Sequence, residues 1–261
     1  MSAYPNYAKE VLSQGRIALG FGVNQSRTVE IAQIARTCGF HWLFIDMEHT
    51  PLNVETAAQM AVAALSVGIA PIVRVPGKEG HHASRLLDAG AQGIVVPHVD
   101  TVEQAQRAVA HCKYPPIGER SAMGTHPLMR FESVPVAQTL REVNDVTLVV
   151  VMLETREAIS RADEIAAVEG VDVVLIGTND LCATMGIPGQ FEHADVVKAY
   201  ETVLAACRKH GKVPGMGGVY EPKIMEKYIR MGMRFILSGS DTSFVIAGAR
   251  ARAKALNDIA L

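Results

Sequence analysis

The sequence predicts an α/β protein with the fold of a TIM (β/α)8 barrel, and three observations support this. A single kind of junction recurs, in which a helical pattern ends in Gly and an apolar, strand-like run begins one or two residues later. Most of these runs are apolar throughout, which is typical of a parallel sheet covered on both faces. Eight runs fit into 261 residues, and eight βα units in a chain of this length favour a closed barrel over an open doubly wound sheet.

The junction appears at six places: "ARTCGFHWLFID", "ALSVGIAPIVRV", "LLDAGAQGIVVP", "AAVEGVDVVLIG", "CRKHGKVPGMGG" and "IRMGMRFILSG". Glycine suits the left-handed residue that closes a helix before a short loop. Two further runs, "RIALGFGV" and "VTLVVVMLE", complete the set. The predicted strands span residues 16–23, 41–48, 70–75, 92–97, 147–154, 172–177, 212–218 and 234–239.

The segments between the strands have apolar residues at helical spacing, as in "NVETAAQMAVAALSVG" and "TVEQAQRAVAHCK". One connection is unusually long, because residues 114–135 separate the fourth helix from the fifth strand without a clear pattern. Long loops of this kind in compact domains are usually functional or flexible. No linker or low-complexity segment interrupts the chain, so we expect a single domain over residues 1–261.

The composition excludes several classes of protein. The formal net charge is -2 and no block of like charges occurs, which argues against a nucleic-acid partner. No apolar run is long enough to span a membrane, and the polar start "MSAYPNYAKE" lacks the core of a signal peptide. We therefore expect a soluble, cytoplasmic protein. The four cysteines have no CxxC spacing, which argues against a zinc knuckle and a thioredoxin-type motif; they are Cys38, Cys112, Cys182 and Cys207.

In a TIM barrel the active site lies at the carboxyl ends of the strands. Polar side chains come at the ends of several of the apolar runs, so we expect them to line the mouth of the barrel with charges of both signs. These side chains are Asp46, Glu48, His49, Arg74, His98, Glu154, Asn179 and Asp180.

Glu154 and Asp180 follow neighbouring strands, so their carboxylates should lie side by side. Two anionic oxygen ligands without a nearby Cys suit Mg²⁺ or Mn²⁺, with water or substrate oxygens completing the shell. Without a cation the two charges would repel, and one carboxyl would tend to remain protonated. In the alternative interpretation each residue only caps the helix that follows it.

Arg74 lies in an otherwise apolar strand and therefore needs an anion to offset its desolvation. Asp46, Glu48 or a substrate carboxylate could supply that anion, and a purely structural ion pair is the alternative. His49 is a candidate general base whose ring a carboxylate could orient, although a lone histidine is more often structural. We interpret the other candidate histidines, His98 among them, as structural. The lysines argue against a Schiff-base mechanism, since only Lys78 approaches a suitable position.

Several separated motifs, in order along residues 15–250, resemble the HpcH/HpaI aldolase family of metal-dependent pyruvate aldolases. The motifs are "IDMEH", "RVPG", "LLDAGAQGIVVPHVDTVEQA", "YPPIGERS", "VMLET" and "IGTNDL". The resemblance implies a catalytic site in which Glu154 and Asp180 bind Mg²⁺, Mn²⁺ or Co²⁺ and Arg74 faces the pyruvate oxygens. It further implies a base, His49, paired with Asp88. The remaining roles that it implies are support from Asp46 and Glu48, and substrate contacts from Gly177, Thr178 and Asn179.

The implied reaction is the reversible cleavage of a 4-hydroxy-2-oxo acid to pyruvate and an aldehyde. The resemblance also implies a homo-oligomer, a trimer or hexamer, that exchanges its last helix, here "TSFVIAGARARAKALNDIAL", between subunits. Two rival functions remain open: an oxaloacetate decarboxylase similar to macrophomate synthase, and a non-catalytic barrel that binds a carboxylate. Two positions depart from the family. Met152 stands where a Gln is usual, and the loop "SAMGTHPLMRF" is bulkier than the usual glycine-rich one.

Overall fold

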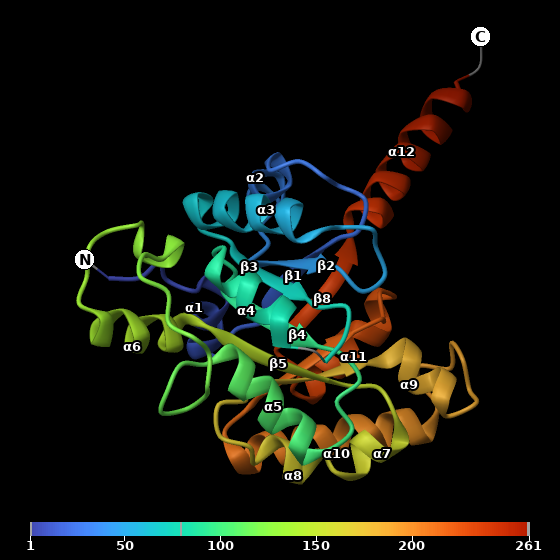
Figure 1. The fold of residues 1–261 in the computed structure, drawn as a ribbon. Helices are drawn as coiled ribbons and strands as arrows, with labels where there is room; N and C mark the ends of the chain where they lie inside the picture. Colours follow the sequence, from blue (N-terminus) through green and yellow to red (C-terminus); the bar gives the residue numbers. More distant parts are fainter. Residues whose placement is uncertain (1, 79, 260–261) are drawn as a thin grey trace.

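The fold is a closed barrel of parallel strands surrounded by helices, as the computed structural model of residues 2–78 and 80–259 shows (Figure 1). The barrel closes because β1 pairs with both β2 and β8. The predicted barrel is confirmed, and each strand lies within two residues of its predicted position at either end. In the described residues the strands are β1 (Ala18–Val23), β2 (Trp42–Asp46), β3 (Ala70–Arg74), β4 (Gly93–Val96), β5 (Leu148–Leu153), β6 (Val173–Gly177), β7 (Val213–Gly217) and β8 (Phe235–Ser240).

Twelve α-helices and one 3-10 turn connect and cover these strands in the described part of the chain. They are α1 (Tyr7–Ser13), α2 (Glu30–Thr37), α3 (Val54–Val67), α4 (Gly80–Asp88), α5 (Val102–Cys112), η1 (Pro127–Met129), α6 (Val136–Val146), α7 (Arg156–Ser160), α8 (Ala162–Ala166), α9 (Thr178–Thr184), α10 (Ala194–His210), α11 (Pro222–Met231) and α12 (Asp241–Asn257). Gly68 and Gly211 close α3 and α10 in the left-handed conformation, with φ of 71° and 66°. The glycine junctions therefore act as the sequence predicts.

The apolar strands bury both of their faces. One face fills the barrel with side chains such as Trp42, Phe44, Ile72 and Leu175. The other face packs against the helices in a larger cluster that includes Leu43. This two-sided burial explains why the strand sequences do not alternate between apolar and polar residues. The single-domain prediction agrees with this arrangement but stays a prediction.

The C-terminal helix α12 extends away from the barrel (Figure 1). Its apolar residues Val245 and Ile246 are 69% and 44% exposed in the single chain. The predicted last helix, residues 242–261, thus exists as a helix over Asp241–Asn257, although residues 260–261 lie outside the described part. Its exchange between subunits stays a prediction.

The long connection between α5 and α6 contains the short turn η1, which packs Leu128 and Met129 into a small apolar cluster with Tyr114. The segment is therefore packed and has more structure than its sequence pattern indicates. Within the described residues, no helix is both long and apolar enough to cross a membrane.

Candidate active site

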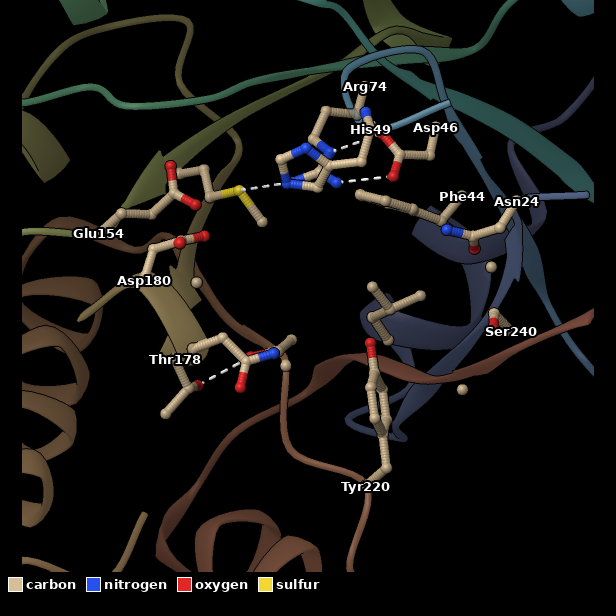
Figure 2. A pocket seen from close by; sticks show the side chains of 18 residues that line it. Asn24, Phe44, Asp46, His49, Arg74, Glu154, Thr178, Asp180, Tyr220 and Ser240 are labelled. Carbon is tan, nitrogen blue, oxygen red and sulfur yellow. Dashed lines mark hydrogen bonds and ion pairs between the residues drawn. The ribbon is translucent and has the colours of Figure 1, made fainter. Parts of the chain in front are cut away.

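A pocket of about 170 Å³ opens at the carboxyl ends of the strands (Figure 2). Most of the residues singled out by the sequence line it, because β2, β3 and β5 end there. Asp46 and Arg74 are paired in the register of β2 and β3, so their side chains rise from adjacent positions. None of the lysines in the described residues lines this pocket; Lys78 lies 3.7 Å from Asp100 in an ion pair instead.

Arg74 is held in place by two carboxylates. Its Nε and Nη2 atoms donate to the two oxygens of Asp46 at 2.9 and 2.7 Å, and Nη1 lies 2.8 Å from Glu48 Oε2. Burial opposes the charge of Arg74, but Asp46 and then Glu48 outweigh it and raise the pKa of the guanidinium above its ordinary value. The predicted ion pair therefore exists, and it leaves Nη1 beside Met152 Sδ at 4.0 Å, at the wall of the pocket.

Glu154 is almost fully buried, with 1% of its surface exposed. Burial, with smaller contributions from the charges of Asp180 and Glu48, raises the pKa of its carboxyl to about 7 against the opposing effect of His98. Gly177 allows the close approach of this side chain, since a Cβ there would lie 2.6 Å from Glu154 Cγ. Figure 2 shows Glu154 and Asp180 next to each other on one wall of the pocket.

The helix-capping alternative is wrong for Glu154 and is not supported for Asp180. Thr155, and not Glu154, accepts the capping hydrogen bond of α7. Asp180 lies inside the first turn of α9, and the N-cap of this helix is Gly177, which has no side chain to accept a capping hydrogen bond. Both carboxylates are thus free of a capping role and face the pocket.

The carboxylates of Glu154, which is buried, and of Asp180 are oxygen ligands of the kind that fits a divalent cation. A cation between Glu154 and Asp180 would offset the desolvation and repulsion that raise the pKa of Glu154. Among the described residues no group of three or more His, Cys, Asp or Glu side chains is arranged as a complete metal site. The remaining ligands would therefore have to be water or substrate oxygens.

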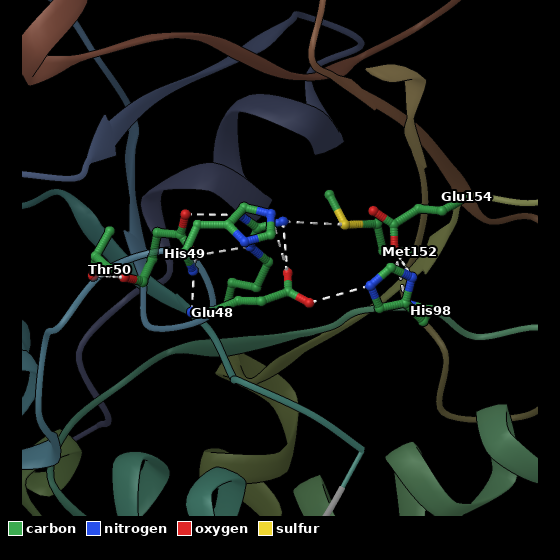
Figure 3. Close-up of polar contacts among 8 residues, drawn as sticks. Glu48, His49, Thr50, His98, Met152 and Glu154 are labelled. Carbon is green, nitrogen blue, oxygen red and sulfur yellow. Dashed lines mark hydrogen bonds and ion pairs between the residues drawn. The ribbon is translucent and has the colours of Figure 1, made fainter. Parts of the chain in front are cut away.

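His98, which the sequence led us to interpret as structural, lies between Glu48 and Glu154 and contacts both carboxylates (Figure 3). Its backbone N–H donates to Glu154 Oε2 at 2.8 Å, and its Nδ1 lies 3.1 Å from the same oxygen. Its Nε2 lies 3.3 Å from Glu48 Oε1. His98 adopts a left-handed φ of 53°, a conformation that is uncommon outside glycine and is found at functional sites.

His49 lies at the mouth of the pocket with 59% of its side chain exposed, and its Nε2 is 3.9 Å from Glu48 Oε2. The predicted pairing with Asp88 is not formed within the chain. Asp88 is the last residue of α4, which runs from the carboxyl end of β3 back to the amino end of β4. It therefore lies at the opposite end of the barrel, where it is 2.5 Å from Arg120 Nη2.

The three residues that precede Asp180, namely Gly177, Thr178 and Asn179, were predicted to contact the substrate. Gly177 and Asn179 line the pocket beside Thr178. The Thr178 hydroxyl donates to Gly217 O at 2.8 Å and lies 2.7 Å from the Tyr200 hydroxyl. Because this hydroxyl is already bonded inside the fold, a substrate contact by Thr178 would have to use its backbone.

The sequence did not single out several other residues that line the pocket. Asn24 and Tyr220 follow β1 and β7, Ser240 is the last residue of β8, and all three lie on the side of the cavity away from Glu154 (Figure 2). Their positions at or after strand ends were visible in the sequence, but polar residues are common at such positions. Only the geometry brings these three together with Arg74.

A sequence model of the HpcH/HpaI aldolase/citrate lyase family matches residues 23–248. The chain is 40% identical to the 4-hydroxy-4-methyl-2-oxoglutarate aldolase tasA of Hapsidospora irregularis, over 100% of this chain and 98% of that protein. It is 36% identical to a 4-hydroxy-2-oxo-heptane-1,7-dioate aldolase of Salmonella paratyphi C, over 95% of this chain and 93% of that protein.

Solved structures agree with these relatives. An HpcH/HpaI aldolase from Desulfitobacterium hafniense superposes with a TM-score of 0.90 at 30% identity, covering 97% of each chain. A macrophomate synthase superposes with a TM-score of 0.81 at 26% identity, covering 98% of this chain and 91% of that one.

Proposed function

The chain belongs to the HpcH/HpaI aldolase/citrate lyase family, and from this premise we propose that it is a divalent-metal-dependent aldolase. Its substrate would be a 4-hydroxy-2-oxo acid, cleaved reversibly to pyruvate and a second carbonyl compound. The observation that best supports this is the position of the fixed Arg74 guanidinium in the same pocket as the Glu154–Asp180 pair. A 2-oxo acid presents a carboxylate and a keto oxygen, which match a guanidinium and an oxygen-seeking cation.

Glu154 and Asp180 are the residues that would hold Mg²⁺, Mn²⁺ or Co²⁺. When bound, the cation supplies Lewis-acid stabilisation of the charge that develops on the keto oxygen. Arg74 adds a second positive charge, and Asp46 and Glu48 prevent it from turning away. Fixed charges of this kind stabilise a developing enolate without the cost of reorganising solvent.

His49 is the proposed base. It would take the proton of the 4-hydroxyl while the C3–C4 bond breaks and its electron pair forms the enolate of pyruvate. The oxygen on C4 then becomes the carbonyl of the second product, and protonation of C3 completes pyruvate. Asp88 keeps its proposed role toward His49 only if a second copy of the chain supplies it, since the two residues lie at opposite ends of one barrel.

Oxaloacetate decarboxylation is the second candidate, favoured by the structural similarity to macrophomate synthase. It would use the same cation pair and Arg74 to stabilise the same enolate, but it has no hydroxyl proton to remove. The two reactions therefore differ in their need for His49.

The test is an assay of pyruvate release from 4-hydroxy-2-oxo acids, before and after thorough chelation and after restoration with Mg²⁺, Mn²⁺ or Co²⁺. We expect chelation to abolish the release and the cations to restore it, and Glu154→Gln to remain inactive with every cation. Release that survives chelation, or borohydride trapping of pyruvate on Lys78, would contradict the proposal.

We also propose that the protein forms a homo-oligomer, a trimer or hexamer, in which the exposed apolar residues of α12 are covered by a neighbouring copy. The exposure of Val245 and Ile246 supports this, because a monomer would leave this apolar surface in water.

A further inference from the structure

The pairing of β1 with β8, which closes the barrel, is irregular at the mouth. Gly20 of β1 pairs with Leu237 of β8, and the following pair joins Gly22 to Ser240. Strand β8 thus has one extra residue in this interval, which is the arrangement of a β-bulge. The interval includes Gly239, whose φ of +137° favours glycine. The regular ladder is therefore interrupted where the two strands reach the pocket.

Asp241, the first residue of α12, connects the two strands beyond this bulge. Its Oδ2 atom accepts hydrogen bonds from the backbone N–H groups of Gln25 and Ser26 at 2.9 and 2.6 Å. Its Oδ1 atom accepts from the N–H of Asn24 at 3.1 Å and from that of Thr242 at 2.7 Å. Successive backbone N–H groups that converge on one anion resemble the nests that bind anions in other proteins. The carboxylate thus joins the loop after β1 to the start of α12.

Asp241 is buried and charged. It is 5% exposed, and burial alone would raise the pKa of its carboxyl, but the four backbone hydrogen bonds outweigh burial and lower that pKa below its ordinary value. Hydrogen bonds to an ionised carboxylate are about twice as strong as those between neutral groups. Among the described residues, the hydrogen bonds that join residues 24–26 to another element all go to this carboxylate, since the two from Arg27 Nη1 are local. The position of the loop therefore depends on Asp241.

The loop that Asp241 holds carries Asn24, which lines the pocket on the wall away from Glu154 (Figure 2). The hydrogen bonds of Asn24 among the described residues are made by its backbone. Its side-chain amide therefore keeps donors and an acceptor for a bound molecule. In the proposed reaction the 2-oxo acid end of the substrate lies at Arg74 and Glu154, so the wall at Asn24 faces the part that leaves as the second carbonyl compound.

We propose that Asp241 is a positioning residue, which fixes the pocket wall at the junction of β1 and β8 and so holds the Asn24 amide against the departing part of the substrate. Asp241 is not among the residues that line the pocket, and it acts only through the loop. This inference rests on the proposed aldolase function and adds two residues to that site. It separates their role in cleavage from the enolate chemistry at Glu154.

The test compares two reactions of the protein in the presence of a divalent cation. One is the cleavage of 4-hydroxy-2-oxoglutarate, or of whichever 4-hydroxy-2-oxo acid the wild-type protein cleaves fastest. The other is the exchange of the C3 protons of pyruvate with D₂O, followed by NMR, which needs only the wall with Arg74 and Glu154. We expect Asp241→Ala to lower kcat/KM for cleavage about tenfold to a hundredfold, the scale of a misplaced substrate contact, and to change the exchange rate little.

Asn24→Ala distinguishes positioning from folding. It removes the amide but keeps the backbone N–H that donates to Asp241, so it should lower cleavage to a similar extent with little change in urea unfolding. In the double variant, Asp241→Ala should add little to the loss caused by Asn24→Ala, because the two residues act through one contact. Asp241→Asn keeps one of the two acceptor oxygens and should fall between the wild-type protein and Asp241→Ala; it replaces Asp241→Ala if that variant does not fold.

A matched control breaks a similar connection at the other end of the barrel. Asn144 is 8% exposed, and its side chain accepts from the N–H of Tyr114 at 2.7 Å and donates to the carbonyl oxygen of Tyr114 at 3.0 Å. It lies near the end of α6, which leads to the amino end of β5. Asn144→Ala should therefore lower the stability in urea without a selective loss of cleavage.

Several outcomes would overturn the inference. Equal losses of cleavage and exchange in Asp241→Ala, or no loss of either, would show that Asp241 does not position the substrate wall. Full cleavage by Asn24→Ala, or additive losses in the double variant, would show that Asp241 does not act through Asn24. Each of these results leaves the proposed function intact, whereas a wild-type protein that neither exchanges pyruvate protons nor cleaves would overturn both.

Discussion

The pair between Asp46 and Arg74 allows a prediction about stability that does not depend on the reaction. Asp46 is 2% exposed and Arg74 is 6% exposed, and two hydrogen bonds join them. Asp46→Asn keeps the shape of the side chain but removes the charge that offsets a buried guanidinium. Removal of one partner of a buried pair costs about 3–5 kcal/mol. Because Glu48 remains 2.8 Å from Arg74, we expect about 3 kcal/mol, at the lower end of that range.

The assay is urea unfolding at a fixed protein concentration, since assembly would shift the apparent stability. Asp163→Asn is the matched control, because Asp163 pairs with Lys209 at 2.8 Å on the exposed surface, where such pairs contribute about 1 kcal/mol or less. The double variant of Asp46→Asn with Arg74→Met should lose less than the sum of the two single variants. Equal costs for Asp46→Asn and Asp163→Asn, or purely additive losses, would refute the buried ion pair.

Two further predictions follow from the site and one from the exposed helix α12. Without cations, the wild-type protein should lose up to about 3 kcal/mol of stability relative to Glu154→Gln as the pH rises from about 5 to about 8, because the pKa of the Glu154 carboxyl in the folded state is raised to about 7. Chemical unfolding at a series of pH values measures this loss, and a difference in stability that does not change with pH would contradict the prediction. His49→Ala should abolish aldol cleavage but retain oxaloacetate decarboxylation, and equal losses in the two assays would argue against its role as base. Val245→Asp should dissociate the oligomer in light scattering, whereas an unchanged mass would show that this face of α12 is not in the interface.

The barrel was predictable because each of its determinants is local in the sequence. The glycine that ends a helix and the apolar run that follows it are contiguous, so each αβ step can be recognised without knowledge of the rest of the chain. The first polar residue at the end of an apolar run then marks the carboxyl end of a strand. This rule placed Arg74 and Glu154 at the mouth of the barrel. The assignment of roles within the site depended on the resemblance, since spacing alone left the capping alternatives open.

His98 shows what such local reasoning cannot provide. Its ring reaches both Glu48 and Glu154 because its backbone has a left-handed φ of 53°, and histidine adopts this conformation too rarely for the sequence to indicate it. The three contacts to the two carboxylates hold the conformation in place. His98 is therefore a site residue whose role depends on partners that are distant in the sequence.

Asp88 shows the complementary error. Its motif "LLDAG" lies next in sequence to a strand of the barrel, and a role at the active site follows from the resemblance without any statement about which chain supplies it. The direction of α4 decides the matter, because a helix that returns to the amino end of the next strand takes its last residue away from the mouth. Among the described residues of one chain, the His49 ring consequently has Glu48 as its one ion-pair partner, with Nε2 3.9 Å from Glu48 Oε2. If Asp88 orients His49, the base is complete only in the assembled oligomer, so Asp88→Asn and the dissociating Val245→Asp should impair aldol cleavage in the same way.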